Sequence, residues 1–259
     1  MPSLPLIIDS TFAANLNAKG NRCLISFAPP LQIPRGVTPR LRLYSSSFAY
    51  NFPNVDSSNN QLVINRTTGG QTKTIAFATG LYGTLDDIAR IIKHELHADA
   101  NFNQLEVNLI GVAATQKVHL EVKNQYNDTV TFSFTSGSSI GPLMGFTQDV
   151  VFPANFTTSR ESDTTAALDR TTSILIQTSL CSGSVLRGQG GSSTLAMVHL
   201  GGEVPSSVVS YQPNNMLEVP AMQLAGGAIT SATFALINQS GEDVDTLGEN
   251  WQLVVEVAW

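Results

Sequence analysis

The chain has 259 residues, a mass of 27.7 kDa and a formal net charge of −6. Only 13% of its residues are charged, about half the roughly 25% usual in soluble proteins, whereas 42% are hydrophobic. This length allows one large β-type domain or two small domains with a sizeable core. The low and acidic charge excludes a coiled coil, a charge-rich disordered chain and a basic nucleic-acid binder.

No membrane span and no leader are expected from the sequence. No stretch approaches the roughly 18–20 apolar residues that cross a bilayer. The first residues, MPSLPLIIDS, lack the positive segment and the long apolar segment of a signal peptide.

The two cysteines, Cys23 and Cys181, each adjoin an apolar run, which favours buried free thiols. Whether they pair as a disulfide stays open. Asn-x-Ser/Thr sequons are expected by chance in a chain this rich in Asn, Ser and Thr, and they occur at Asn65, Asn127, Asn155 and Asn238.

The first part of the chain has the pattern of short β-strands separated by clusters of Gly, Pro, Asn and Ser. A strand at 22–28 precedes a Pro-rich turn. A second strand, within 38–50, places its apolar residues on one face and Arg40 and Arg42 on the other. Two strands joined by a Gly-Gly segment, 61–65 and 72–78, predict a hairpin.

One amphipathic helix is predicted at 84–97. Thr84 suits its N-cap, and Asp86 and Asp87 suit the positive end of its dipole. One helical face carries Leu85, Ile88, Ile91, Ile92 and Leu96. That face must pack against a sheet, because a single amphipathic helix is not stable alone.

Alternating strands are predicted again after the helix, at 104–111, 117–124 and 129–136, followed by an apolar loop at 138–146. The polar segment 153–170 lacks periodicity and is interpreted as a connector. Strands are then expected at 171–180, 194–201, 216–220, 229–238 and 251–259.

Many antiparallel-type strands with one helix predict a mainly β protein, a single jelly-roll β-sandwich with an inserted small α+β domain. The jelly roll would be discontinuous, formed by 1–52 and 160–259. Residues 53–155 would be the inserted β-rich domain, with the helix at 84–97. The strand order stays open.

The segment His94-Glu95-Leu96-His97 resembles a zinc-protease helix, but its spacing does not fit. Such a helix needs histidines at i and i+4, and here the second His is at i+3. His119 and His199 are far away in sequence. We therefore expect no metal site and interpret this segment as a solvent-facing helix end in which Lys93 and His97 favour the C-terminal dipole.

Other motifs are equally weak. The acidic run 241–249 does not have the ligand spacing of an EF-hand, although a loosely bound calcium stays an alternative to a solvated loop. The Gly-rich segment 187–193 matches neither a P-loop nor a dinucleotide-binding motif, and no nucleophile elbow is present. The sequence therefore predicts no cofactor and no catalytic residues.

Three arginines, Arg35, Arg40 and Arg42, cluster near the N-terminus. They are candidates for contacts with a neighbouring subunit or an acidic partner. A solvated strand face is the alternative.

Four short motifs resemble the penton, or vertex, proteins of jelly-roll double-stranded DNA viruses: virophages, polinton-like viruses and, more distantly, adenoviruses. The motifs fall in the order and spacing seen in that family: YNIPN-like, G-x-Y-s-x-x-D-L-like, LGF-like and G-E-x-W. They match Tyr50, Asn51, Phe52, Pro53 and Asn54; Gly80, Tyr82, Leu85, Asp86, Asp87 and Ile88; Met144, Gly145 and Phe146; and Gly248, Glu249, Asn250 and Trp251.

The resemblance implies a structural capsid protein without catalysis, found in the virion capsid and assembled in the host cell. Five copies would surround each icosahedral fivefold vertex as a homopentamer and contact neighbouring major capsid proteins. The insertion would face outward, towards a host receptor or a fibre. Direct contact with nucleic acid is not implied. No Arg-Gly-Asp occurs, and the nearest sequence is Arg187-Gly188-Gln189, so integrin binding is not carried over.

Two other classes stay open beside a capsid subunit. A carbohydrate-binding or receptor-binding β-sandwich of a phage or virus would need exposed aromatic side chains in a groove, and only 7% of residues are aromatic. An enzyme would need the His94 region or a triad assembled in space.

Overall fold

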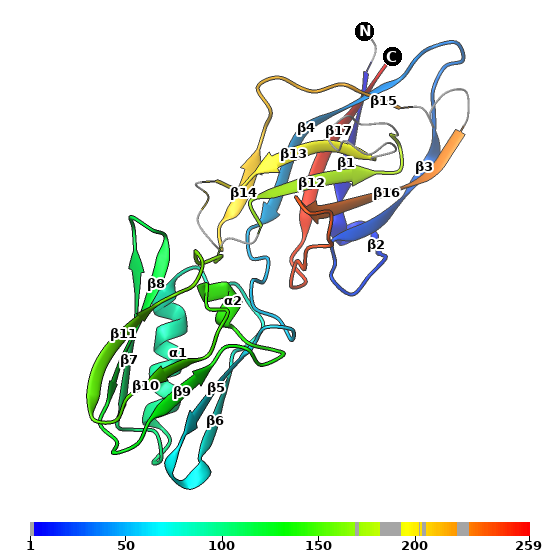
Figure 1. The fold of residues 1–259 in the computed structure, drawn as a ribbon. Helices are drawn as coiled ribbons and strands as arrows, with labels where there is room; N and C mark the ends of the chain where they lie inside the picture. The colour runs from blue at the N-terminus through cyan, green and yellow to red at the C-terminus, as the bar shows by residue number, and fades with distance from the viewer. Residues whose placement is uncertain (1–2, 169–170, 182–192, 202, 204–205, 222–227) are drawn as a thin grey trace. The chain divides into compact units, whose positions relative to one another are not determined.

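The structure, a computed structural model, describes residues 3–168, 171–181, 193–201, 203, 206–221 and 228–259. It divides into two compact units. Unit 1 contains residues 1–52 and 171–259, and unit 2 contains residues 53–170 (Figure 1).

Unit 1 is a sandwich of two antiparallel sheets. The first sheet has the order β1-β17-β4-β14, with β15 also paired to β4. Its strands are β1 (Ser3–Asp9), β4 (Arg40–Ala49), β14 (Val208–Tyr211), β15 (Val219–Pro220) and β17 (Trp251–Ala258). The second sheet has the order β13-β12-β16-β3-β2. Its strands are β2 (Ala14–Asn15), β3 (Arg22–Gln32), β12 (Ser173–Thr178), β13 (Thr194–His199) and β16 (Ala228–Asn238).

The pairing in unit 1 is that of a jelly roll. Leaving out the short strands β2 and β15, the strands in chain order are β1, β3, β4, β12, β13, β14, β16 and β17. The first pairs with the last, the second with the seventh, the third with the sixth and the fourth with the fifth, all antiparallel. This is one long hairpin folded over on itself into two sheets, as in viral capsid and lectin domains. The fold class expected from the sequence is therefore confirmed.

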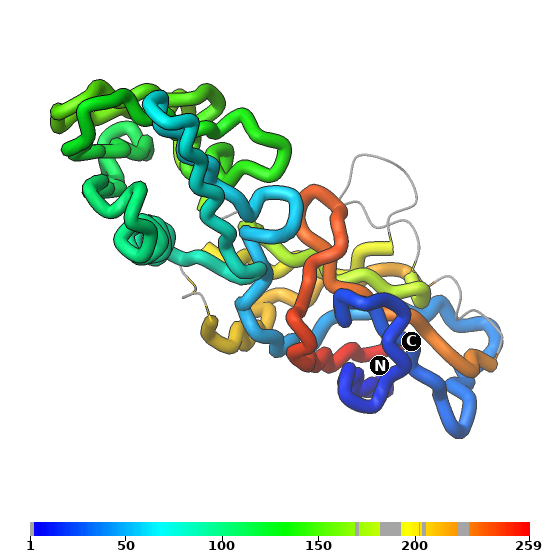
Figure 2. The backbone as a smooth tube through the Cα atoms, turned by 90° about the horizontal axis from the view of Figure 1, so that it is seen from below, coloured from blue at the N-terminus to red at the C-terminus, as the bar shows by residue number. Residues whose placement is uncertain are grey.

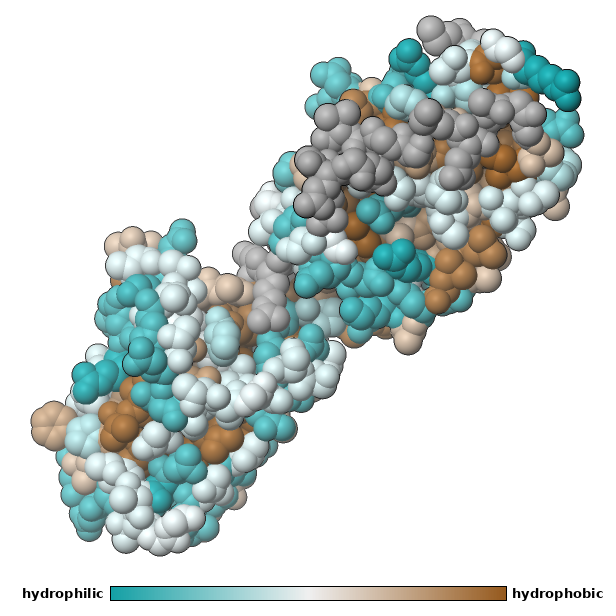
Figure 3. Space-filling model, turned by 45° about the vertical axis from the view of Figure 1, so that its right-hand side comes forward, coloured by the Kyte–Doolittle hydropathy of each residue, from teal (hydrophilic) through white to brown (hydrophobic). Residues whose placement is uncertain are grey.

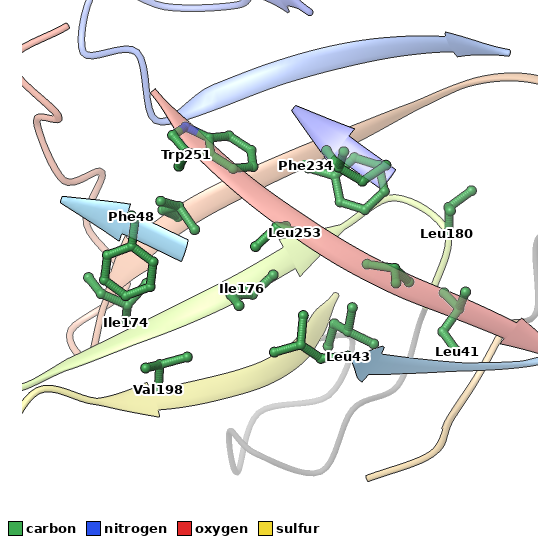
Figure 4. Packing of buried hydrophobic residues seen from close by; sticks show 14 of the residues in the cluster. Leu41, Leu43, Phe48, Ile174, Ile176, Leu180, Val198, Phe234, Trp251 and Leu253 are labelled. Carbon is green, nitrogen blue, oxygen red and sulfur yellow. The ribbon is translucent and has the colours of Figure 1, made fainter. Parts of the chain in front are cut away.

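Apolar side chains fill the space between the two sheets. Trp251, Phe234, Leu41 and Leu253 are at most 1% exposed. Figure 4 shows them with Phe48, Ile174, Ile176 and Val198 between strands of both sheets. Alternating inward and outward residues make one face of each strand apolar.

The two termini lie side by side (Figure 2) because β1 pairs with β17 along its whole length, from Ser3 opposite Ala258 to Asp9 opposite Gln252. A strand at residues 3–9 is not among those predicted from the sequence. A one-turn 3-10 helix, η1 (Ser10–Phe12), connects β1 to β2.

Unit 2 is an α+β module of two sheets and a helix. One sheet has the order β10-β9-β5-β6 and the other β11-β8-β7. The strands are β5 (Gln61–Arg66), β6 (Thr72–Ala76), β7 (Leu105–Val112), β8 (Lys117–Asn124), β9 (Val130–Ser133), β10 (Val150–Phe152) and β11 (Phe156–Glu161). Helix α1 (Leu85–His97) contacts β7, and short helices η2 (Thr68–Gly70) and α2 (Gly141–Met144) complete the unit.

Helix α1 agrees with its sequence prediction. Thr84 is the N-cap, and its Oγ1 accepts a hydrogen bond from Asp87 N at 3.2 Å. Ile88, Ile92 and Leu96 are buried in the core of unit 2, with Leu85 and Ile91 partly buried beside them.

The expected connector 153–170 is wrong in part. Residues 156–161 form β11, which pairs with β8, and Ser162, Ala166 and Ala167 hydrogen-bond back to unit 2. Most residues of β11 are exposed, so its sequence shows no alternation. Unit 2 therefore extends to residue 170, rather than ending at the expected 155.

Three smaller expectations are also corrected. The Pro-rich segment after 28 continues β3 to Gln32, because a register shift against β16 accommodates it. The apolar loop 138–146 contains α2. In the predicted strand 216–220, only Val219 and Pro220 pair with β4.

Candidate interaction surfaces and motif residues

Asn54 connects three segments of unit 2. Its side chain is buried, and Nδ2 donates to Tyr82 O at 2.9 Å and to Leu168 O at 2.8 Å. Its Oδ1 accepts from Tyr82 N at 2.9 Å. The first residues of the unit, the turn before α1 and the last described residues of the unit therefore meet at one amide side chain.

The other residues of the motif at 50–54 lie in or beside the core of unit 1 or at the start of unit 2. Tyr50 is 4% exposed in the core of unit 1, where its ring lies 6.1 Å from that of Phe52. Asn51 donates to Thr246 O at 3.4 Å, and Pro53 is half-buried at the first position of unit 2. The side chains of Tyr50 and Asn51 therefore contact other parts of unit 1.

Tyr82, Asp86 and Asp87 set the start of α1. The hydroxyl of Tyr82 donates to Ala78 O at 3.0 Å, and burial raises its pKa. Asp86 and Asp87 lie in the first helical turn, where their charge stabilises the positive end of the helix dipole.

Gly145 and Phe146 close the short helix α2. Gly145 has φ +85°, and an added Cβ would lie 2.3 Å from Thr164 O. Only glycine fits both the backbone conformation and this close approach. Phe146 is 1% exposed and stacks on Phe134 with ring centroids 4.6 Å apart.

The motif at the start of β17 contacts two earlier segments of unit 1, η1 and the turn at Gly20. Trp251 Nε1 donates to Gly20 O at 3.0 Å, and Trp251 N donates to Ser10 Oγ at 2.8 Å. Gly248 has φ +81°, and Glu249 is exposed. Of this motif, only Gly248, Glu249 and Asn250 remain accessible.

Arg40 and Arg42 share one face of β4, as expected, and both form ion pairs within the chain. Glu218 lies 2.9 Å from Arg40 Nη1 and 3.6 Å from Arg42 Nη1. Arg42 Nε also donates to Glu256 at 2.7 Å, which lowers the pKa of that carboxyl. The Arg40 side chain is still 58% exposed, and Arg35 is exposed in the loop after β3.

The segment His94–His97 and the acidic run 241–249 were the two segments considered as metal sites. His94 and His97 are exposed at the end of α1, and Glu95 pairs with Lys73 at 3.1 Å. In the acidic run, Asp243 accepts from Arg22 Nε at 2.7 Å. Burial raises the pKa of Asp243, but the hydrogen bonds from Asn21 and Arg22 outweigh it and the pKa is lowered. Among the described residues, no three His, Cys, Asp or Glu side chains are grouped to hold a metal ion.

Cys23 and Cys181 are both free and buried, in agreement with the sequence prediction. The Gly-rich segment 187–193, together with Arg187-Gly188-Gln189, lies outside the described residues except for Ser193. None of the helices in the described ranges has the length and apolar character of a membrane span.

Exposed apolar side chains are features that the sequence did not indicate. On the face shown in Figure 3, hydrophobic residues form separate patches among hydrophilic ones. In unit 1 the large exposed side chains include Ile7 (76%), Phe12 (87%) and Val208 (67%), and in unit 2 they include Phe156 (63%). The sequence gives no signal for either residue: β1 lacks the alternation that would place Ile7 on an exposed face, and nothing distinguishes Phe12 from a core aromatic.

The comparisons with known proteins find a structural neighbour but no match by sequence. No protein-family model and no curated protein matches the chain. Among solved structures, the chain is similar to the crystal structure of selenomethionine-labelled mavirus penton protein. The TM-score is 0.49 and the identity 9%, and the alignment covers 99% of each chain.

Proposed function

We propose that this chain is a penton, a structural subunit of a viral capsid. Five copies form a ring at each icosahedral fivefold vertex and contact the neighbouring major capsid proteins. The jelly roll forms the base of the ring, and the insertion faces outward, towards a host receptor or a fibre. The protein is assembled in the host cell and resides in the virion.

The observation that carries this proposal is the architecture. An eight-stranded jelly roll is interrupted between its third and fourth strands by a complete folded unit with its own core. Jelly rolls also occur in lectins and cupins, so the fold alone does not define a function. The insertion and the motif residues are the features that favour a capsid subunit here.

The motif residues support the proposal because they specify this architecture. Asn54 ties the beginning of the insertion to its end, and Gly145 holds α2 against Thr164. Trp251 anchors the last jelly-roll strand. A resemblance in these residues is therefore a resemblance in how each of the two units is held together.

The core of unit 1 favours a structural role over a cupin-type enzyme. A cupin-like site needs polar ligands between the two sheets. Here that space contains packed apolar side chains, among them Phe48, Ile176 and Leu253, each at most 2% exposed.

A carbohydrate-binding or receptor-binding module is the second candidate, because one pocket in unit 2 has polar walls. It has a volume of about 260 Å³ and is lined by Arg66, Thr68, Gln104, Gln125, Tyr126, Asn127 and Asp128. However, the Arg66 guanidinium covers the Tyr126 ring at 3.6 Å from its centroid, so the ring is not open for stacking on a sugar. Glycan-array binding that is lost in Gln125→Ala, at an exposed position in the pocket wall, would favour this candidate.

The test of the penton proposal is electron microscopy of the purified chain, alone and mixed with the major capsid protein of the same virus. The proposal predicts rings with fivefold symmetry in at least one of the two samples. A chain that forms no ring alone and none with the capsid protein would contradict it.

A further inference from the structure

The jelly roll has two lateral edges that differ in shape. One edge is formed by β1, η1 and β2, since β1 and β2 end the described order of the two sheets. The opposite edge is formed by β14 and β13. Figure 1 shows β13 and β14 on one side of the sandwich and β2 and β3 on the other.

The first edge carries a protruding aromatic side chain. Phe12, 87% exposed, is the most exposed large apolar residue in the described ranges. It lies in η1, whose backbone and side chains form hydrogen bonds with both β1 and β17. Asp9 Oδ1 accepts from Thr11 N at 2.9 Å, and Ser10 Oγ accepts from Trp251 N at 2.8 Å. Phe12 is therefore presented on a fixed backbone, with Ile7 exposed nearby on β1.

The second edge carries an apolar pocket. It has a volume of about 180 Å³ and is lined mainly by Leu43, Leu195, Met197, Tyr211, Pro213 and Leu217. Leu217 is 55% exposed, and Val208 on β14 is 67% exposed. A dry apolar cavity of about 150 Å³ can hold a benzene ring, so this pocket is large enough for one phenyl group.

Charged groups lie beside both features. Asp9 is three residues from Phe12, and its carboxylate contacts Gln252 Nε2 at 2.7 Å. Leu217 precedes Glu218, whose partner Arg40 keeps a half-exposed guanidinium. Because Arg40 and Arg42 both pair with Glu218, the Asp9 carboxylate of one copy would meet a site with an exposed guanidinium on the next, which favours one orientation of two copies over the reverse.

One chain cannot fill its own pocket, because Phe12 and the pocket lie on opposite edges of the same sandwich. A second copy can. Contacts between two different surfaces of identical subunits are head-to-tail, and they close into a ring when the rotation between copies allows it. A buried aromatic residue in an apolar pocket is the usual form of a dominant interface contact.

We propose that Phe12 of one subunit inserts into the pocket between β13, β14 and the 212–218 loop of the next subunit, and that this contact closes the ring. Ile7 and Val208 would be buried around it, and Asp9 would face Arg40. The inference rests on the proposed penton function, because it names the surfaces through which the copies associate.

The first test compares two exposed phenylalanines. Phe12→Ser removes the protruding side chain, and Phe156→Ser, in unit 2, is the matched control. Phe12→Ser is expected to raise the concentration at half-assembly about tenfold or more, with an unchanged thermal unfolding midpoint. Phe156→Ser should assemble like the wild type. Equal assembly of the wild type and Phe12→Ser would overturn this contact and leave the penton proposal intact.

The second test maps the contact directly by oxidation of engineered cysteines. A mixture of Phe12→Cys and Leu217→Cys chains should form a disulfide between the two variants, faster than either variant does alone. The native thiols are buried and should stay reduced. Cross-linking of Phe12→Cys to itself in preference would contradict the head-to-tail arrangement. A wild type that stays monomeric in both tests, and also forms no ring when mixed with the major capsid protein, would overturn this contact and the pentamer together.

Discussion

At the scale of single residues, the motif positions act through hydrogen bonds and close contacts inside the chain. Asn54 is the clearest case, because its side-chain amide forms hydrogen bonds with backbone groups of both Tyr82 and Leu168. These groups lie far apart in the sequence and would be left without a partner if the amide were removed.

Asn54→Ala is expected to destabilise unit 2 by about 3 kcal/mol, since it leaves buried polar groups unsatisfied. Both tryptophans, Trp251 and Trp259, belong to unit 1, so tryptophan fluorescence reports that unit alone. In urea, the helical circular dichroism signal of α1 should be lost at a lower concentration, while the tryptophan transition stays in place. Asn108→Ala, at an exposed position of β7, is the control. Equal midpoints for the two variants would contradict this role.

Gly145→Ala should also destabilise unit 2, by about 2–4 kcal/mol, because the alanine would need φ +85° and its Cβ would clash with Thr164 O. Gly80 is the matched control, because a Cβ added there would meet nothing within 4 Å and its φ is not positive. Gly80→Ala should therefore change the free energy of unfolding far less. The measurement is urea unfolding of both variants followed by helical circular dichroism.

Cys23 and Cys181 should react slowly with a thiol reagent in the folded protein. Burial raises the pKa of both thiols to about 11, so the reactive thiolate is scarce at pH 8. Titration with a disulfide reagent should find almost no fast thiols in buffer and two per chain in urea. Fewer than two in urea would reveal a disulfide.

At the scale of elements, two of the strands that the sequence did not indicate, β1 and β11, are edge strands. β11, an outer strand of its sheet, is polar after Phe156 and is exposed on both faces, so its sequence has the pattern of a connector. β1 has apolar residues at successive positions and contains Pro5, so it lacks the alternation that identifies a strand. In contrast, α1 and the β5–β6 hairpin have local signals, and both were predicted within a few residues of their bounds.

Asp149 forms hydrogen bonds between two strands of unit 2, and their contribution to stability should depend on pH. It joins the end of β9 to the start of β10 by accepting hydrogen bonds from Phe134 N at 2.8 Å and Thr135 N at 3.0 Å. Burial raises its pKa, but the hydrogen bonds from Thr135, Ser133 and Phe134 outweigh this and the pKa is lowered.

A lowered pKa in the folded state means that the ionised carboxylate stabilises unit 2 above the ordinary aspartate pKa of about 3.9. That stability is lost as the pH falls through the lowered value. Asp149→Asn should cost about 1 kcal/mol at pH 7, since solvent screens this exposed group, and the cost should shrink towards pH 3. Urea unfolding of wild type and variant at both pH values tests this. A cost that does not change with pH would contradict the assignment.

At the scale of the whole molecule, the sequence predicted the class but not the partners of its strands. The jelly roll and the start of the insertion at residue 53 follow from strand patterns and from the motif that ends at Asn54. The pairing of β1 with β17 could not be predicted, because it joins residues at opposite ends of the chain. Glu218 and Glu256, which pair with Arg42, could not be named for the same reason.

The central claim is that copies of this chain close into a ring of five, and the most direct test is the mass in solution. Light scattering on a sizing column should give a species of about 139 kDa, five copies of the 27.7 kDa chain. Its proportion should rise with protein concentration. A single species of 27.7 kDa at every concentration, both alone and with the major capsid protein of the same virus present, would contradict the account.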